Sequence, residues 1–146
     1  MSVPKAFFDA NVLLYMYGGT DLSKQAPAKE LFRRYAQSGR ILLSTQVVQE
    51  FSAGSRKLGM LRPELQEAAA ALLDLPLVTV GRAHILTAMR TEERYVISFW
   101  DALILAAAES GGAEVLYTED LSDGQQYGTV LLRDPFRVSE VSSFTL

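Results

Sequence analysis

The sequence has 146 residues, a length that fits one domain with a substantial core. Its net charge of −3 and pI near 5.2 argue against a general polyanion-binding surface, because nonspecific binding of nucleic acid needs many Lys and Arg. The chain has no Cys and one His, which excludes a disulfide framework, a thiolate zinc site and a multi-His metal site. It also lacks a signal-peptide pattern and any apolar run of about 18 residues, so we expect a cytoplasmic protein with no membrane partner.

The first informative stretch is a short apolar run that ends at Phe8 and is followed by Asp9-Ala10-Asn11. Such a run is typical of a strand buried in a sheet, and the apolar segment after it has helical spacing. In an open α/β sheet, ligands bind beyond the carboxyl ends of the strands, which would place Asp9 on that edge. The alternative is that Asp9 and Asn11 only cap the following helix.

The rest of the chain alternates between short apolar runs and amphipathic or apolar segments of helical length. Further strands are expected at residues 41–43, 76–80, 114–117 and 129–132, and helices at 12–17, 23–38, 46–57, 63–73, 82–94 and 98–109. This alternation predicts a single domain over residues 1–146, a three-layer α/β/α sandwich with a central parallel sheet of about five strands. Phe136 and Phe144 in the tail are expected to dock on the body.

Four carboxylates fall where one element gives way to the next: Asp9, Glu50, Asp101 and Asp120. Positions after successive parallel strands lie along one edge of a sheet, so these groups can meet in space. Two carboxylates about 5 Å apart repel by roughly 3 kcal/mol at an effective dielectric of about 20. A cluster of them must therefore take up protons or bind a cation, and a ligand set made only of oxygens favours Mg²⁺ or Mn²⁺ over Zn²⁺.

Each acid also has a purely structural interpretation. Glu50 could be a solvated residue of an amphipathic helix, and Asp101 follows Ser98 at the spacing of a capping box. Asp120 could be an ordinary loop acid, and this interpretation is favoured for its neighbours Glu119 and Asp123.

Trp100 and His84 are the remaining side chains whose type is common in functional sites. Trp100 precedes Asp101 and could be a stacking platform for a base, although a lone Trp in an apolar helix is expected to lie in the core. His84 is far in sequence from the acids and is expected at the surface or its boundary.

The chain resembles the PIN-domain ribonucleases, and specifically the VapC toxins of toxin–antitoxin pairs. Four stretches carry the resemblance, in the family's order and across nearly the whole chain: Phe8-Asp9-Ala10-Asn11-Val12-Leu13-Leu14-Tyr15, Val48-Gln49-Glu50-Phe51, Ser98-Phe99-Trp100-Asp101-Ala102-Leu103-Ile104 and Tyr117-Thr118-Glu119-Asp120-Leu121-Ser122-Asp123-Gly124.

The resemblance implies a Mg²⁺- or Mn²⁺-dependent endoribonuclease that acts on single-stranded or looped RNA, often transfer RNA. Asp9, Glu50, Asp101 and Asp120 would be the catalytic metal ligands, with Asp123 as an alternative source of the last acid. Other residues implied at the site are Asn11 and Thr118 as hydrogen-bonding support, and Arg56, Lys57 and Arg62 along the RNA path, unless these cations only solvate a helix end. The implied partners are a small antitoxin that blocks the site and a second copy of the chain.

Three other functions are less consistent with the sequence. A phosphatase with Asp9 as nucleophile calls for Asp-x-Asp after the first strand, and the second position here is Asn11. A phosphorylated receiver domain needs an Asp after the third strand, where this chain has Val80-Gly81-Arg82. A PIN-like domain that only binds RNA or protein is disfavoured by the intact acids.

Overall fold

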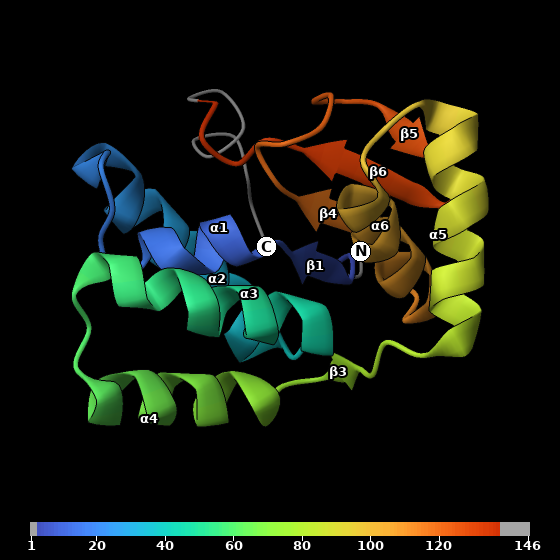
Figure 1. Ribbon diagram of the computed structural model, residues 1–146. Coiled ribbons are helices and arrows are strands. Elements are labelled where there is room, and N and C mark those ends of the chain that lie inside the picture. Colours follow the sequence, from blue (N-terminus) through green and yellow to red (C-terminus); the bar gives the residue numbers. More distant parts are fainter. Residues whose placement is uncertain (1–2, 138–146) are drawn as a thin grey trace.

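The structure is a computed structural model and describes residues 3–137. Six strands form one sheet in the order β3-β2-β1-β4-β6-β5 (Figure 1). The strands are β1 (Ala6–Phe8), β2 (Ile41–Ser44), β3 (Leu77–Val78), β4 (Val115–Tyr117), β5 (Gln126–Tyr127) and β6 (Val130–Arg133). All neighbours pair in parallel except β5 and β6, which are antiparallel.

The predicted three-layer α/β/α architecture is confirmed, but the sheet has one strand more than expected. The additional strand, β5, has two residues and forms a hairpin with β6 around Gly128, whose φ is +58°. So short a strand leaves no alternating pattern in the sequence, and residues 120–128 are rich in the turn-forming residues Asp, Ser and Gly.

The six predicted helices are confirmed to within a few residues at each end. They are α1 (Ala10–Tyr15), α2 (Gln25–Ser38), α3 (Thr45–Ser55), α4 (Arg62–Leu73), α5 (Arg82–Tyr95) and α6 (Phe99–Ser110), with short 3-10 helices at Leu22–Lys24 and Arg56–Leu58. Side-chain caps mark the starts of α3 and α6, where the Ser44 hydroxyl accepts from the Val47 amide and the Ser98 hydroxyl accepts from the Asp101 amide. No helix within residues 3–137 is long and apolar enough to cross a membrane.

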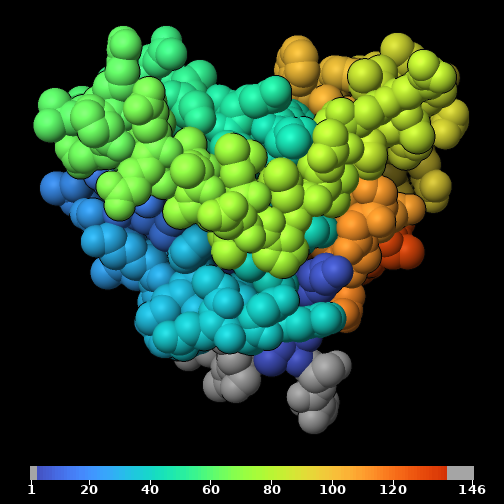
Figure 2. All heavy atoms as spheres, turned by 90° about the horizontal axis from the view of Figure 1, so that it is seen from below, coloured from blue at the N-terminus to red at the C-terminus, as the bar shows by residue number. Residues whose placement is uncertain are grey.

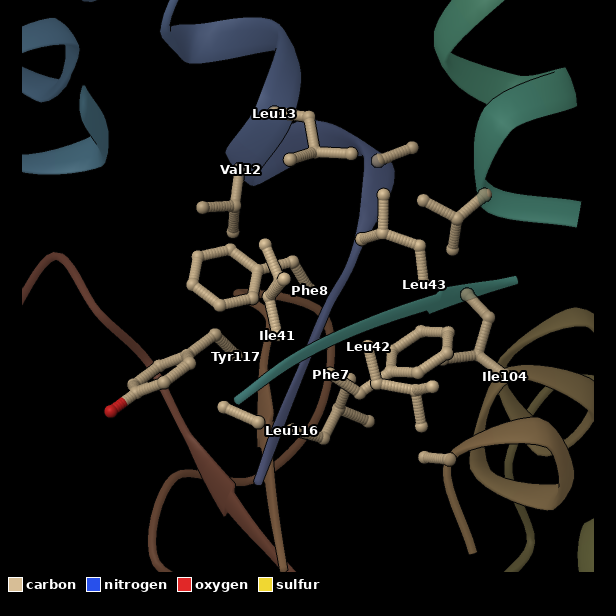
Figure 3. Close-up of a cluster of buried hydrophobic side chains, with 14 of the residues drawn as sticks. Phe7, Phe8, Val12, Leu13, Ile41, Leu42, Leu43, Ile104, Leu116 and Tyr117 are labelled. Carbon is tan, nitrogen blue, oxygen red and sulfur yellow. The ribbon is translucent and has the colours of Figure 1, made fainter. Parts of the chain in front are cut away.

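The core lies on both faces of β1, which is fully buried along its length. Phe7 and Phe8 point to opposite sides of the sheet, Phe7 towards Leu42 and Ile104 and Phe8 towards Val12 and Tyr117 (Figure 3). This explains why the strand is apolar without alternation.

The helices divide between the two sides of the sheet and leave one edge of strand ends accessible. The apolar α6 packs on β2, β3 and β6, and α2 on β2. The arrows of β1, β4 and β6 point the same way, so their carboxyl ends share an edge (Figure 1). Seen from below, the regions of α4 and α5 form two lobes with α3 visible between them (Figure 2).

The tail returns to the body at Phe136, as predicted. Its ring packs edge-on against Tyr15, with ring centroids 5.0 Å apart. The other aromatic residue expected to dock, Phe144, lies outside the described residues.

Candidate metal centre

Asp9 is held at the shared edge of β1 and β4. Phe8 of β1 is paired with Tyr117 of β4 in the parallel register, so the next residues, Asp9 and Thr118, lie side by side at the ends of these strands. The Thr118 hydroxyl donates to Asp9 Oδ2 at 2.7 Å, and the Ala10 amide donates to Asp9 Oδ1 at 2.7 Å. Asp9 therefore caps α1, as the structural interpretation predicted, while its carboxylate also faces the strand edge.

The loop after β4 is tied to the same pair. The Asp120 amide donates to Thr118 Oγ1 at 3.1 Å, while that hydroxyl donates its own proton to Asp9. Thr118, 2% exposed, thus connects the backbone of Asp120 to the carboxylate of Asp9.

The other two acids come from helices that start near this edge. Glu50 lies in the second turn of α3, which follows β2 beside β1, and Asp101 lies in the first turn of α6. Glu50 is exposed and Asp101 is half-buried. Ser98 caps α6 by accepting from the Asp101 amide, so capping and a place in the acid cluster are not exclusive roles.

The pKa values of Asp9, Glu50 and Asp101 are each raised in part by other acids of this group. The pKa of Asp9 is raised to about 7, chiefly by burial and further by Asp120 and Glu50, while the hydrogen bonds from Thr118 and the Ala10 amide oppose the rise. Although Glu50 is exposed as a whole residue, the pKa of its carboxyl group is raised by partial desolvation and then by Asp101 and Asp120. The pKa of Asp101 is raised by burial and by Asp120. The structure therefore gathers the four acids into one electrostatic cluster.

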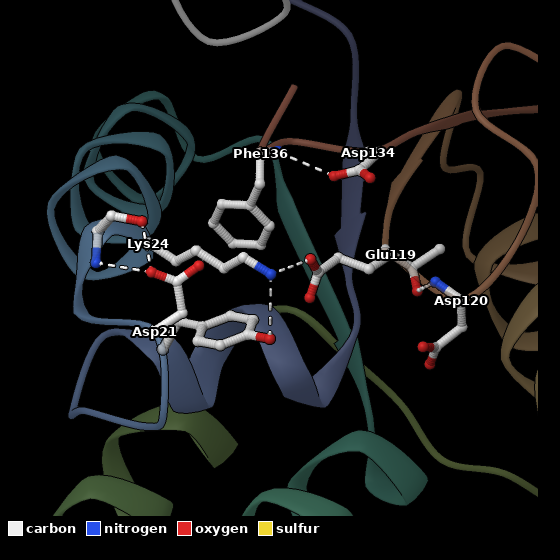
Figure 4. A network of polar contacts seen from close by, with 9 residues as sticks. Asp21, Lys24, Glu119, Asp120, Asp134 and Phe136 are labelled. Atoms are coloured by element: carbon white, nitrogen blue, oxygen red, sulfur yellow. Dashed lines mark hydrogen bonds and ion pairs between the residues drawn. The ribbon is translucent and has the colours of Figure 1, made fainter. Parts of the chain in front are cut away.

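No cationic side chain in residues 3–137 is among the groups that shift the pKa of Asp9, Glu50 or Asp101. Lys24, which reaches the loop after β4, pairs with an acid outside the cluster. Its ammonium group pairs with Glu119 at 2.5 Å and contacts the Tyr15 hydroxyl at 3.5 Å. Figure 4 shows Glu119 pointing to Lys24 and Asp120 pointing the other way.

The structure also separates the three acids of this loop. Asp120 belongs to the cluster, Glu119 belongs to the Lys24 pair, and Asp123 faces the tail. Asp123 accepts from the Asp134 amide at 2.8 Å and pairs with Arg137 at 3.4 Å. The choice left open by the sequence, between Asp120 and Asp123, falls on Asp120 as the acid near the other three.

Three other residues that the resemblance implied at the site, Asn11, Arg56 and Lys57, make no contact with the four acids that the structure records. Asn11 is exposed in the first turn of α1, and its side chain makes no hydrogen bond within residues 3–137. Arg56 lines a groove of about 710 Å³ between α3 and α4, together with Met60 and Arg62. Lys57 is exposed beside it in the short 3-10 helix. None of the three is among the groups that shift the pKa of the clustered acids.

The sequence did not single out Gln46, which is 5% exposed between α3 and α6. Its Nε2 donates to the Trp100 carbonyl at 3.2 Å, and the side chain also lowers the pKa of Glu50. Gln46 precedes Glu50 by four residues, so the two share a helix face, and this spacing was the available signal. The expectation that Trp100 lies in the core is wrong, because its side chain is 63% exposed.

The donor set suits a hard cation, but the acids are not yet arranged as ligands. Within residues 3–137 no three Asp, Glu or His side chains are grouped closely enough to hold a metal ion. Asp9 is fixed by two hydrogen bonds, whereas Glu50 and Asp120 are exposed. The only His is engaged elsewhere, with Nδ1 of His84 accepting from the Gly81 amide. The carboxylate oxygens of the four acids are of the donor type that Mg²⁺ or Mn²⁺ prefers.

Residues 6–122 match the PIN domain family. The chain belongs to this family. The match covers the strands and helices that carry all four clustered acids of this PIN domain. No curated protein matches the sequence.

Solved structures have the same fold at low sequence identity. A toxin–antitoxin complex from Klebsiella pneumoniae has a TM-score of 0.69 and 21% identity over 91% of this chain and 99% of that one. VapC20 of Mycobacterium tuberculosis, a sarcin-ricin loop cleaving toxin, has a TM-score of 0.62 and 19% identity, over 76% of this chain and 86% of that one. DNA-bound VapBC from Salmonella typhimurium has a TM-score of 0.61 and 17% identity, over 91% of this chain and 99% of that one. The PIN domain described here therefore shares its fold with proteins of toxin–antitoxin systems.

Proposed function

We propose that this PIN domain is a Mg²⁺- or Mn²⁺-dependent endoribonuclease and the toxin of a toxin–antitoxin pair. The observation that carries the proposal is the cluster of four acids from four separate segments, in which no cationic side chain of residues 3–137 is among the groups that shift the pKa of Asp9, Glu50 or Asp101. The fold shared with toxin–antitoxin proteins, one of them described as cleaving the sarcin-ricin loop, supports the choice of RNA as substrate.

Asp9 and Asp101 would be the principal ligands, with Glu50 and Asp120 turning in to complete the site. A bound divalent ion would lower the pKa of a water molecule and neutralise charge on the phosphate. Thr118 and the Ala10 amide each occupy one oxygen of Asp9 and fix its orientation, which leaves a lone pair on each oxygen for a ligand. With a pKa of about 7, Asp9 would release a proton when an ion binds, so binding should weaken below neutral pH.

Removal of divalent cations should abolish cleavage. We expect the purified protein to cut single-stranded RNA in Mg²⁺ or Mn²⁺, to stop when EDTA is added in excess, and to recover when Mn²⁺ is restored. A fluorogenic RNA oligonucleotide gives the rate directly. The matched control is Asp123→Asn, whose acid contacts Arg137 and the Asp134 amide and not the cluster. Cleavage that continues in EDTA would refute the metal assignment.

We further propose two protein partners, a small antitoxin that covers the acids and a second copy of this chain. Exposed apolar side chains on α5, among them Leu86 (51% exposed) and Met89, offer surface for the second copy. Light scattering of the purified chain should give about twice its 16.1 kDa mass, and Leu86→Glu should halve that value. A mass of 16.1 kDa for the unchanged protein at micromolar concentration would contradict the homodimer.

A further inference from the structure

The sole tryptophan, Trp100, exposes 63% of its side chain at the start of α6. Tryptophan is usually among the more buried residues of a domain, because its ring gains more than most side chains from leaving water. A single exposed apolar residue needs no explanation by itself. The support beneath this ring and its place beside the acids distinguish Trp100 from the other exposed apolar side chains.

The backbone beneath the indole is fixed by a buried side chain. Gln46 donates from Nε2 to the Trp100 carbonyl at 3.2 Å and is itself 5% exposed. Phe99 packs edge-to-face with the indole, with ring centroids 5.3 Å apart and an interplanar angle of 79°. An edge-to-face contact occupies at most one face of a ring, so the exposed indole is braced but retains an open face.

The same hydrogen bond ties the backbone of Trp100 to the helix that carries Glu50. Trp100 directly precedes Asp101 in the first turn of α6, and Gln46 lies one turn before Glu50 on α3. The hydrogen bond from Gln46 therefore joins the two helices that carry these acids. If the proposed ion holds a phosphate of the RNA at these acids, the attached nucleotide would lie close to the start of α6, where Trp100 precedes Asp101.

We propose that Trp100 is a stacking platform for an unpaired base next to the phosphate that is cut. The inference rests on the proposed nuclease function and narrows its substrate to strands with a base outside a helical stack. Base–aromatic stacking tolerates any base, because every base has a π face. Trp100 thus selects for an unpaired nucleotide and leaves sequence preference to other contacts.

The test measures cleavage kinetics and the fluorescence of this one indole. Trp100→Ala should raise KM for a single-stranded RNA about 10- to 100-fold with a smaller effect on kcat, and Trp100→Phe should restore most of the loss. Leu61→Ala, which removes a side chain that is 66% exposed at the start of α4, is the matched control and should cleave as the unchanged protein does. Thermal melts of all variants would show that each is folded.

The binding arm uses Asp9→Asn, so that RNA is not consumed. A short oligoribonucleotide should quench the indole fluorescence, and the same strand with abasic positions should quench it far less. Cleavage by Trp100→Ala with an unchanged KM would overturn the stacking role while leaving the nuclease intact. Absence of quenching by any oligoribonucleotide would also overturn it, and a halved mass for Trp100→Ala without quenching would assign the ring to a subunit contact. Loss of cleavage in EDTA tests the nuclease separately.

Discussion

Replacing Asp9 by Asn should lower the rate of RNA cleavage about 1000-fold while the protein stays folded. Asp9 is the acid held most firmly at the strand edge, with both oxygens hydrogen-bonded and the side chain 5% exposed. Loss of its charge removes a ligand from the proposed ion, and the several kcal/mol that such an ion contributes correspond to a rate factor of about 10³. Single-turnover cleavage of a fluorogenic RNA at saturating Mn²⁺ measures the change in the chemical step.

Two neighbouring acids provide controls within one loop. Asp120→Asn should also slow cleavage strongly, because Asp120 raises the pKa of Asp9, Glu50 and Asp101 and therefore lies near all three. Asp123→Asn should leave the rate within a few-fold of normal, since Asp123 is engaged by the tail through the Asp134 amide. If Asp123→Asn were inactive and Asp120→Asn active, the assignment of the last acid would be reversed.

The fold could be predicted from the sequence wherever local pattern and tertiary packing agree. Phe7 and Phe8 are buried on opposite faces of β1, so an uninterrupted apolar run was the correct signal for a central strand. Ser98, three residues before Asp101, marked the start of α6 and does cap it. The strand β5 could not be found in this way, because its pairing with β6 depends on the hairpin and not on its two residues.

The candidate site was predictable in its placement and less so in its contacts. That Asp9 and Thr118 would share an edge follows from the parallel order of strands, which the alternation of elements implies. The pairing of Glu119 with Lys24 could not be predicted in this way, because the two residues are 95 positions apart in the sequence and no pattern relates them. The exposure of Trp100 was also missed, since an apolar helix such as α6 predicts burial for most of its residues and the first turn extends beyond the core.

Metal-free protein should lose stability as the pH rises from about 5 to 7, and Asp9→Asn should lose much less. The pKa of Asp9 is raised from its ordinary 3.8 to about 7, mainly by burial, so in this range the folded state keeps a proton that the unfolded chain has released. The free energy of unfolding then falls by up to about 1.4 kcal/mol per pH unit, and this contribution flattens below pH 4 and above pH 7. Urea unfolding in EDTA at pH 5, 6, 7 and 8 measures it.

The comparison between variants isolates Asp9 from the rest of the cluster. Glu50 and Asp101 also have raised pKa values, so Asp9→Asn should keep a smaller decline of the same sign, while Asp123→Asn should follow the unchanged protein. At pH 8 the Asn variant should be more stable than the unchanged protein, because it has no charge to bury at that position. Mg²⁺ should reverse this order by stabilising only the chain that retains the carboxylate. Parallel stability curves for the two proteins would show that Asp9 is ionised at neutral pH without an ion, and the electrostatic argument for a cation at this edge would lose its basis.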